Sequence, residues 1–155
     1  LLNDEMTAVA ASYGVPVVIM HMQGKPKTMQ ENPKYSNVIE EIKTFFSERI
    51  EKAKNAGIKK IILDPGIGFG KTLEHNLLIL RNLSAFLKFG CPLLVGTSRK
   101  SFIGKITGQD VEDRLEGTVA SSAIAIMNGA RIIRVHEVRE LKAAALVADA
   151  IKNTK

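Results

Sequence analysis

The chain has 155 residues, 45% hydrophobic and 25% charged, a balance typical of one globular domain and not of a disordered chain. Its net charge of +6 admits anionic partners, but the absence of tryptophan, the 5% aromatic content and the scattered basic residues argue against nucleic acid. Apolar stretches fall short of the roughly 18 residues of a membrane span, and Cys91 alone excludes a disulfide framework or a thiolate metal cage. We expect a cytoplasmic protein with small-molecule partners, without nucleic acid or membrane.

The predicted elements alternate between helices and strands. A short helix over 5–13 precedes the first strand. Apolar runs rich in β-branched residues predict four strands, over 15–20, 58–63, 91–96 and 130–135. Each strand is followed by a helical pattern, and these patterns cover approximately 37–57, 73–90, 110–129 and 138–151.

The first long helix carries the clearest local signals. Five apolar residues fall on one face at helical spacing: Val38, Ile42, Phe45, Phe46 and Ile50. Asn37, with Glu40 three residues later, predicts a capping box at the start of this helix. Gly57 stands where a left-handed cap would end it.

The spacing of the strands predicts a parallel sheet. The strand ends fall near His21, Asp64, Thr97 and Val135, about 33 to 43 residues apart, which is the period of a strand and its returning helix. A doubly wound open sheet fits these units. A closed (β/α)8 barrel fits them too, but it needs roughly 250 residues, so this chain would supply only its second half.

Polar residues gather at the predicted strand ends, where both architectures bind ligands. In chain order they are Asn3 and Asp4, Met20 and His21, Asp64, the segment 97–101, and Arg134 with His136. Structural residues have no reason to place carboxylate, ammonium, guanidinium and imidazole groups at equivalent points of successive units. The set therefore predicts a ligand site on one rim of the sheet.

The stretch "IILDPGIGFGKT", residues 61–72, resembles a phosphate loop, but its register fails. A Walker loop would need glycine where Pro65 stands, and the dinucleotide fingerprint would need glycine at Lys71. Asp64 would also place a carboxylate beside the phosphates. Two readings of Asp64 remain open: an acceptor for a flat amidine-like edge such as that of a 2-aminopyrimidinone, or simply part of a turn. We interpret Gly-Lys-Thr as the start of the next helix.

Two further segments carry candidate binding residues. In "GTSRKSFIG", Lys100 leaves a strand and Ser101 begins a short helix, a position that favours an anionic ligand, although a solvated basic turn is the alternative. Arg134 and His136 alternate with Val135, so both are predicted on one side of the last strand, where they suit a diphosphate. The polar segment 23–35 is a rim loop or a plain connector. His75 is treated as filler, and no metal motif is present.

Four segments in this order resemble the dihydropteroate synthase family, the folate-pathway enzymes that sulfonamides inhibit: "VVIMHMQGKPKTMQ", "IILDPGIGFGKT", "LLVGTSRKSFIG" and "RIIRVHEV". The resemblance covers essentially the whole chain. It implies a (β/α)8 TIM barrel, with residues 1–155 forming the C-terminal half of its single domain, from the end of strand 4 to helix 8. It also implies condensation of 7,8-dihydropterin-6-ylmethyl diphosphate with 4-aminobenzoate to give dihydropteroate and diphosphate.

The resemblance assigns a role to each matching residue. Asp64 would hold the pterin ring N–H and 2-amino group, and Lys100 would contact its polar edge. Further pterin contacts would come from Asn3, Met20 and Phe69. Ser101 would take the carboxylate of 4-aminobenzoate. Arg134, stacked over the pterin, and His136 would bind the diphosphate, and Lys100, Arg134 and His136 would be the catalytic groups.

The family's other features would lie mostly outside this chain. Mg²⁺ would help to hold the diphosphate, but its protein ligand would belong to the absent N-terminal half. A homodimer is expected, and the isolated half is predicted to be inactive because it leaves two unpaired sheet edges and lacks catalytic loops. The alternatives are a pterin-binding barrel of the corrinoid methyltransferase type and a noncatalytic pterin-binding module.

Overall fold

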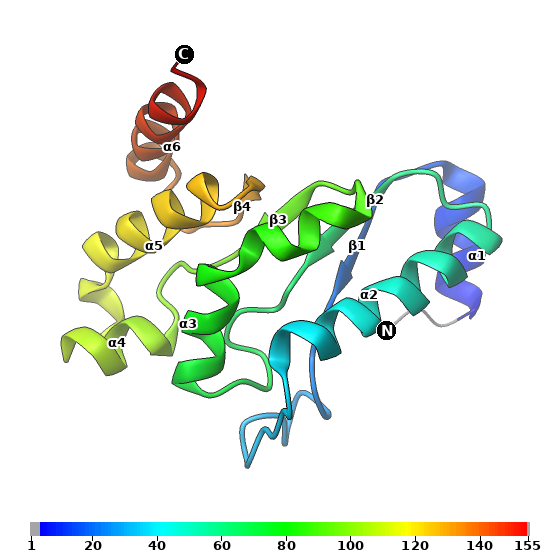
Figure 1. The fold of residues 1–155 in the computed structure, drawn as a ribbon, viewed down its shortest axis with the longest axis horizontal. Helices are drawn as coiled ribbons and strands as arrows, with labels where there is room; N and C mark the ends of the chain where they lie inside the picture. Colours follow the sequence, from blue (N-terminus) through cyan, green and yellow to red (C-terminus); the bar gives the residue numbers. More distant parts are fainter. Residues whose placement is uncertain (1–3, 155) are drawn as a thin grey trace.

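A computed structural model of the chain describes residues 4–154, and its centre is a four-stranded parallel sheet (Figure 1). The strands are β1 (Val17–Met20), β2 (Ile61–Asp64), β3 (Leu93–Val95) and β4 (Ala130–Ile133), and they pair in sequential order. A doubly wound sheet would reverse that order at a switch point, whereas a barrel adds each strand beside the last. The sheet therefore has the topology of a barrel segment. All four predicted strands are present, each shorter than its apolar run.

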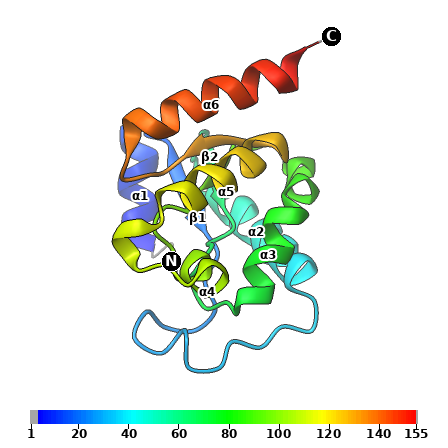
Figure 2. The same cartoon turned by 90° about the vertical axis from the view of Figure 1, so that its left-hand side faces the viewer.

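Helices and 3-10 turns connect the strands and cover the outside of the sheet (Figures 1 and 2). The α-helices are α1 (Asp4–Tyr13), α2 (Val38–Asn55), α3 (Leu73–Arg81), α4 (Ser101–Thr107), α5 (Leu115–Met127) and α6 (Val138–Asn153). The 3-10 segments are η1 (Leu83–Phe89) and η2 (Val111–Asp113). Two predicted helices are thus divided. The helix expected over 73–90 breaks at Asn82, whose side-chain amide donates to the carbonyl of Leu78, and the helix expected from Asp110 begins as η2.

The N-terminus of α2 is capped by Asn37, but not with the predicted partner. The Asn37 side chain accepts hydrogen bonds from the backbone N–H groups of Ile39 and Glu40, at 3.1 and 3.2 Å. The return bond goes to Glu41, whose carboxylate accepts from the Asn37 N–H at 3.1 Å. Glu40 instead pairs with Lys43 at 2.7 Å. The predicted Asn37–Glu40 capping box was therefore wrong in its second residue, because the carboxylate that accepts the backbone N–H of Asn37 belongs to Glu41.

The hydrophobic core lies between α2, η1 and the sheet. Phe46 is fully buried at the centre of the apolar face of α2. Its ring contacts those of Phe86 and Phe89 in η1 edge to face, with 5.6 and 6.0 Å between the ring centres. Ile42 and Ile50 are also buried on this face, as predicted. Full burial of such a side chain contributes about 1.5–3 kcal/mol, so this contact holds α2 firmly against η1.

Within the described part of the chain, the two outer strands β1 and β4 each pair on one side only, so each has one open edge. Apolar side chains remain exposed on both of them, Val18 on β1 and Ile132 on β4. Cavities of about 210 and 340 Å³ follow these edges, the first along β1 and the second between β4 and α6. Open edges of this kind are able to pair with further strands. Among the described residues, none of the helices is both long enough and apolar enough to cross a membrane.

Candidate active site

The carboxyl ends of the strands meet at one edge of the sheet and bring most of the predicted residues together. Met20 and Asp64 are paired neighbours at the ends of β1 and β2, and the N–H of His21 donates to the Asp64 carbonyl at 2.9 Å. Arg134 follows β4, and its N–H donates to the carbonyl of Val95 on β3 at 2.9 Å. The prediction that the strand ends converge on one rim of the sheet is therefore confirmed. Asn3 lies outside the described residues.

Asp64 is the most deeply buried charged group of this rim, with 1% of its surface exposed. Its Oδ1 accepts the N–H of Gly66 at 2.8 Å, which closes the turn after β2. Its Oδ2 is buried without a hydrogen-bond partner in the described chain, although Arg134 Nη2 lies 3.4 Å away. The two readings of Asp64 are compatible, because one oxygen shapes the turn and the other has no hydrogen-bond partner in the described chain.

Burial sets the proton affinity of Asp64. Desolvation raises its pKa above the ordinary value, while the N–H of Gly66 and the charges of Arg134, Lys71 and Lys100 act in the opposite direction. An unpaired buried acceptor costs about 1–3 kcal/mol. A ligand that donates hydrogen bonds to Oδ2 would recover that cost, which favours a donor edge over a phosphate.

The glycines of the loop after β2 allow close approach to the segment after β1. Gly66 and Gly70 adopt left-handed conformations, with φ of 71° and 62°. A Cβ at Gly66 would overlap the carbonyl oxygen of His21, and one at Gly70 would lie 2.5 Å from the carbonyl oxygen of Gln23. Only glycine fits both the dihedral angle and the contact. The glycine pattern that resembles a phosphate loop therefore serves backbone packing.

Lys71, which we interpreted as the first residue of a helix, is instead a buried part of the site. Its ammonium lies 3.0 Å from His21 Nδ1 and donates to the carbonyl of Phe69 at 3.0 Å. Burial lowers the pKa of Lys71 to about 7, although the charge of Asp64 acts in the opposite direction. The pKa of His21 is lowered to about 3, mainly by burial and to a smaller extent by the charge of Lys71. A lysine before a helix start gives no sequence signal for this inward direction. The rest of the prediction is confirmed, because Thr72 caps α3.

His75 is not filler. Its N–H donates to the side-chain oxygen of Thr72, and its Nδ1 accepts from the Thr72 N–H, both at 3.2 Å. The pair forms a capping box at the start of α3, where the sequence suggested a position within the helix. The imidazole also meets the ring of Tyr35 at 4.8 Å, so it links α3 to the long loop before α2.

That long loop, residues 21–37, projects beyond the helices (Figure 2). It returns to contact the glycine loop, residues 65–72, which joins β2 to α3. The Gln30 side chain donates to the carbonyl of Gly68 at 2.6 Å, and the Tyr35 hydroxyl donates to the carbonyl of Gly70 at 2.8 Å. Of the two readings of this segment, the rim loop is therefore favoured over a plain connector.

Lys100 and Arg134 both lie close enough to Asp64 for their charges to lower its pKa. The Lys100 ammonium lies 4.1 Å from the centre of the Phe69 ring, a cation–π contact. Burial and the charge of Arg134 lower the pKa of Lys100, and Asp64 opposes them. The Arg134 guanidinium lies so close to Gly96 that a Cβ there would be 3.2 Å from Nη2. Three strands thus contribute one anion, two cations and one aromatic ring to a single surface.

The remaining predicted residues are more peripheral. Ser101 is exposed as the first residue of α4, and partly buried Met20 lines the cavity along β1. His136 is exposed and bonds to Ser98 Oγ at 2.7 Å. Because β4 ends at Ile133, the predicted alternation along the strand does not orient Arg134 and His136. Arg134 is instead oriented by its contact with Asp64, and His136 by its hydrogen bond with Ser98.

The described residues include no group of three or more His, Cys, Asp or Glu side chains able to hold a metal ion. The carboxylate at the centre of the rim, Asp64, is flanked by Lys71, Lys100 and Arg134. Positive charges at these positions repel a divalent cation. The residues described here therefore do not fit a Mg²⁺ site.

Sheet topology, rim and glycine loop define the class: the chain belongs to the pterin binding enzyme family, which matches residues 2–136. Its curated relatives include the dihydropteroate synthase of Escherichia coli, which is 50% identical over 94% of this chain and 52% of that protein. The chain thus spans about half the length of the curated relatives it matches. The sequence resemblance is confirmed.

Solved structures agree with this assignment. Yersinia pestis dihydropteroate synthase with a sulfonamide drug superimposes with a TM-score of 0.93 at 45% identity, over 96% of this chain and 55% of that one. The Thermus thermophilus enzyme in complex with 6HMPPP superimposes with a TM-score of 0.93 at 43% identity, over 97% of this chain and 61% of that one. The same enzyme in complex with 4-aminobenzoate has a TM-score of 0.92 at 43% identity, over 96% of this chain and 62% of that one. The chain therefore has the fold of about half of a (β/α)8 barrel enzyme.

Proposed function

We propose that residues 1–155 are the C-terminal half of a dihydropteroate synthase barrel. The complete barrel would condense 7,8-dihydropterin-6-ylmethyl diphosphate with 4-aminobenzoate, releasing diphosphate and forming dihydropteroate. The observation that carries this proposal is the buried Oδ2 of Asp64, an acceptor without a hydrogen-bond partner in the described chain. The relatives described above, each a dihydropteroate synthase by name, support it.

Asp64 would hold the pterin. Its Oδ2, with the remaining lone pair of Oδ1, matches the ring N–H and 2-amino group as a fork of two donors. Lys100 would bind the polar edge of the ring, and Phe69, held beneath the Lys100 ammonium, would contact its face together with Met20. Asn3 would add another bond. Arg134, at the side of Asp64 and half exposed, would stack over the pterin.

The chemistry would be displacement at the methylene carbon. Ser101, at the first turn of α4, would receive the carboxylate of 4-aminobenzoate, and sulfonamides would compete there. Arg134 and His136 would bind the leaving diphosphate. The amine attacks carbon as the diphosphate leaves, so Lys100, Arg134 and His136 would act by orientation and by stabilising developing charge. This route needs no covalent nucleophile.

Three features of the proposal depend on surfaces or segments beyond the site. Mg²⁺ would be held by residues outside those described. A homodimer is supported by a hollow of about 610 Å³ on the outer face, where α3, α4 and α5 expose Leu77, Ile106 and Ile124. Light scattering of the complete barrel checks this, and a monomer at micromolar concentration would contradict it. The enzyme would work in the cytoplasm, as folate synthesis does in the family.

The decisive test is Asp64→Asn in a complete barrel that carries this chain. An amide would present a donor where an acceptor is needed, so calorimetry should show pterin affinity reduced at least a hundredfold. Asp113→Asn, which neutralises an exposed carboxylate in η2, is the matched control and should bind normally. Unchanged affinity in Asp64→Asn rules out the anchor role. Pterin binding without condensation in the unmodified barrel would identify a noncatalytic module instead.

A further inference from the structure

Arg99 lies between the end of β3 and the start of α4 and has an unusual backbone conformation. Its φ of 57° lies in the left-handed region, which a residue with a Cβ rarely adopts. Ser98 before it is buried, and Lys100 after it reaches back over Phe69. The reversal at Arg99 is what sends Lys100 toward the rim. Something in the structure must hold this residue there.

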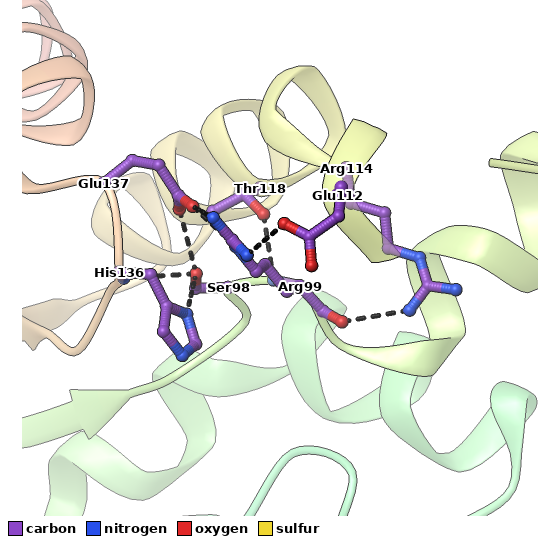
Figure 3. A network of polar contacts seen from close by, with 7 residues as sticks. All are labelled: Ser98, Arg99, Glu112, Arg114, Thr118, His136 and Glu137. Carbon is purple, nitrogen blue, oxygen red and sulfur yellow. Dashed lines mark hydrogen bonds and ion pairs between the residues drawn. The ribbon is translucent and has the colours of Figure 1, made fainter. Parts of the chain in front are cut away.

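Four residues hold Arg99, and all of them follow it in the chain (Figure 3). Its N–H donates to the hydroxyl of Thr118 at 3.1 Å, and its carbonyl accepts from Arg114 Nη1 at 3.0 Å. Its Nε donates to Glu137 Oε1 and its Nη1 to Glu112 Oε2, each at 2.6 Å. Both backbone groups and both sides of the guanidinium are therefore satisfied by η2, α5, Arg114 between them and the residue before α6.

The network continues from Glu137 to His136. Ser98 Oγ lies 3.3 Å from Glu137 Oε2 and 2.7 Å from His136 Nδ1, and it accepts the backbone N–H of His136 at 3.2 Å. A hydroxyl has one proton to donate. Desolvation raises the pKa of Glu137, but the hydrogen bonds and charge of Arg99 outweigh it and leave the pKa below its ordinary value, so Glu137 is an anionic acceptor. If Ser98 donates to Glu137, His136 Nδ1 must carry its own proton.

We propose that Arg99 is a positioning residue that aligns the two sides of the active site. Its turn aims Lys100 and Ser101, and through Glu137 and Ser98 it fixes His136 in the Nδ1–H form, with Nε2 presented to the substrate. The strand-end residues assigned to 4-aminobenzoate and to diphosphate are thereby joined in one charged network. This inference rests on the proposed function, because it names how that site is held in shape.

The kinetic test uses a complete barrel that carries this chain. Arg99→Gly permits the same φ and removes the whole side chain, including the guanidinium, while the backbone N–H and carbonyl of residue 99 remain. It should lower kcat about tenfold and raise the KM for 4-aminobenzoate at least fivefold. Pterin affinity should fall less than tenfold, because Lys100 is affected but Asp64, the main pterin anchor, lies on another strand. Glu137→Gln should have the same effect, and the double variant should add little to either. Arg99→Lys should restore part of kcat.

Glu112→Gln is the matched control, since it breaks the more exposed of the two ion pairs of Arg99. It should change kcat less than twofold. Normal kcat and KM in Arg99→Gly, additive effects of Arg99 and Glu137, or an equal effect of Glu112→Gln would each overturn the proposal. A loss of pterin affinity in Arg99→Gly as large as that expected for Asp64→Asn would do the same, because it would indicate general unfolding.

Nitrogen NMR of a complete barrel that carries this chain gives a readout that does not depend on turnover. The His136 ring should be protonated at Nδ1, and Glu137→Gln should shift it toward the Nε2–H form. A ring protonated only at Nε2 in the unmodified barrel would overturn the inference. An inactive barrel with the expected NMR result would count against the proposed function alone.

Discussion

Replacing Lys71 with methionine tests the buried ammonium beneath the site. Methionine keeps an unbranched side chain of similar length, so the main change is the loss of the charge and of the contacts with His21 and Phe69. Lys71 is 4% exposed, and burial lowers its pKa from 10.5 to about 7 against the pull of Asp64. The substitution should therefore alter how the free energy of unfolding depends on pH.

The expected magnitude follows from linkage. Below pH 7 the lysine is protonated in both the folded and the unfolded chain, and burying its charge reduces stability by a constant amount. Between pH 7 and 10.5 the unfolded chain holds the proton that the folded chain has lost, so stability rises with pH. A shift from 10.5 to about 7 corresponds to about 5 kcal/mol in total, taken as an upper bound. Methionine has no such dependence.

Urea unfolding followed by circular dichroism, from pH 6 to 10, measures the effect. We expect Lys71→Met to be more stable than the unmodified chain at pH 6. At pH 10 it should be less stable, because the lost hydrogen bonds cost about 1–3 kcal/mol and the desolvation cost of the native lysine has nearly vanished. Lys59→Met, at an exposed position, is the control and should show a difference that is flat with pH. A flat difference for Lys71→Met would refute the reasoning.

Two other predictions concern the glycine loop and the chain as a unit. Gly66→Ala and Gly90→Ala both place alanine at a positive φ, which costs about 1–2 kcal/mol, but only at Gly66 does the new Cβ meet backbone. Urea denaturation should show Gly66→Ala to be less stable than Gly90→Ala by about 1–3 kcal/mol, and equal losses would contradict the packing argument. The isolated chain should produce no dihydropteroate in a product assay because it lacks half of the barrel; measurable turnover would refute this.

The local elements could be predicted from the sequence because their signals lie within a few residues. The apolar runs located all four strands, the helical spacing located the face of α2 that is buried, and the glycines at 57 and 90 marked the ends of α2 and η1. Register counting within 61–72 was enough to reject a Walker loop and to single out Asp64. Parallel pairing then follows from the strand spacing, and with it the convergence of the strand ends.

The tertiary structure alone decided which way the polar groups point. Whether Glu40 or Glu41 returns a bond to Asn37 depends on side-chain reach, and the inward direction of Lys71 depends on the close approach of His21, fifty residues earlier. Arg99 looked like an ordinary basic residue beside Lys100 because its partner Glu137 is 38 residues away. Such contacts form only after the strands have taken their register, and no local pattern encodes the distance between two side chains brought together by a sheet.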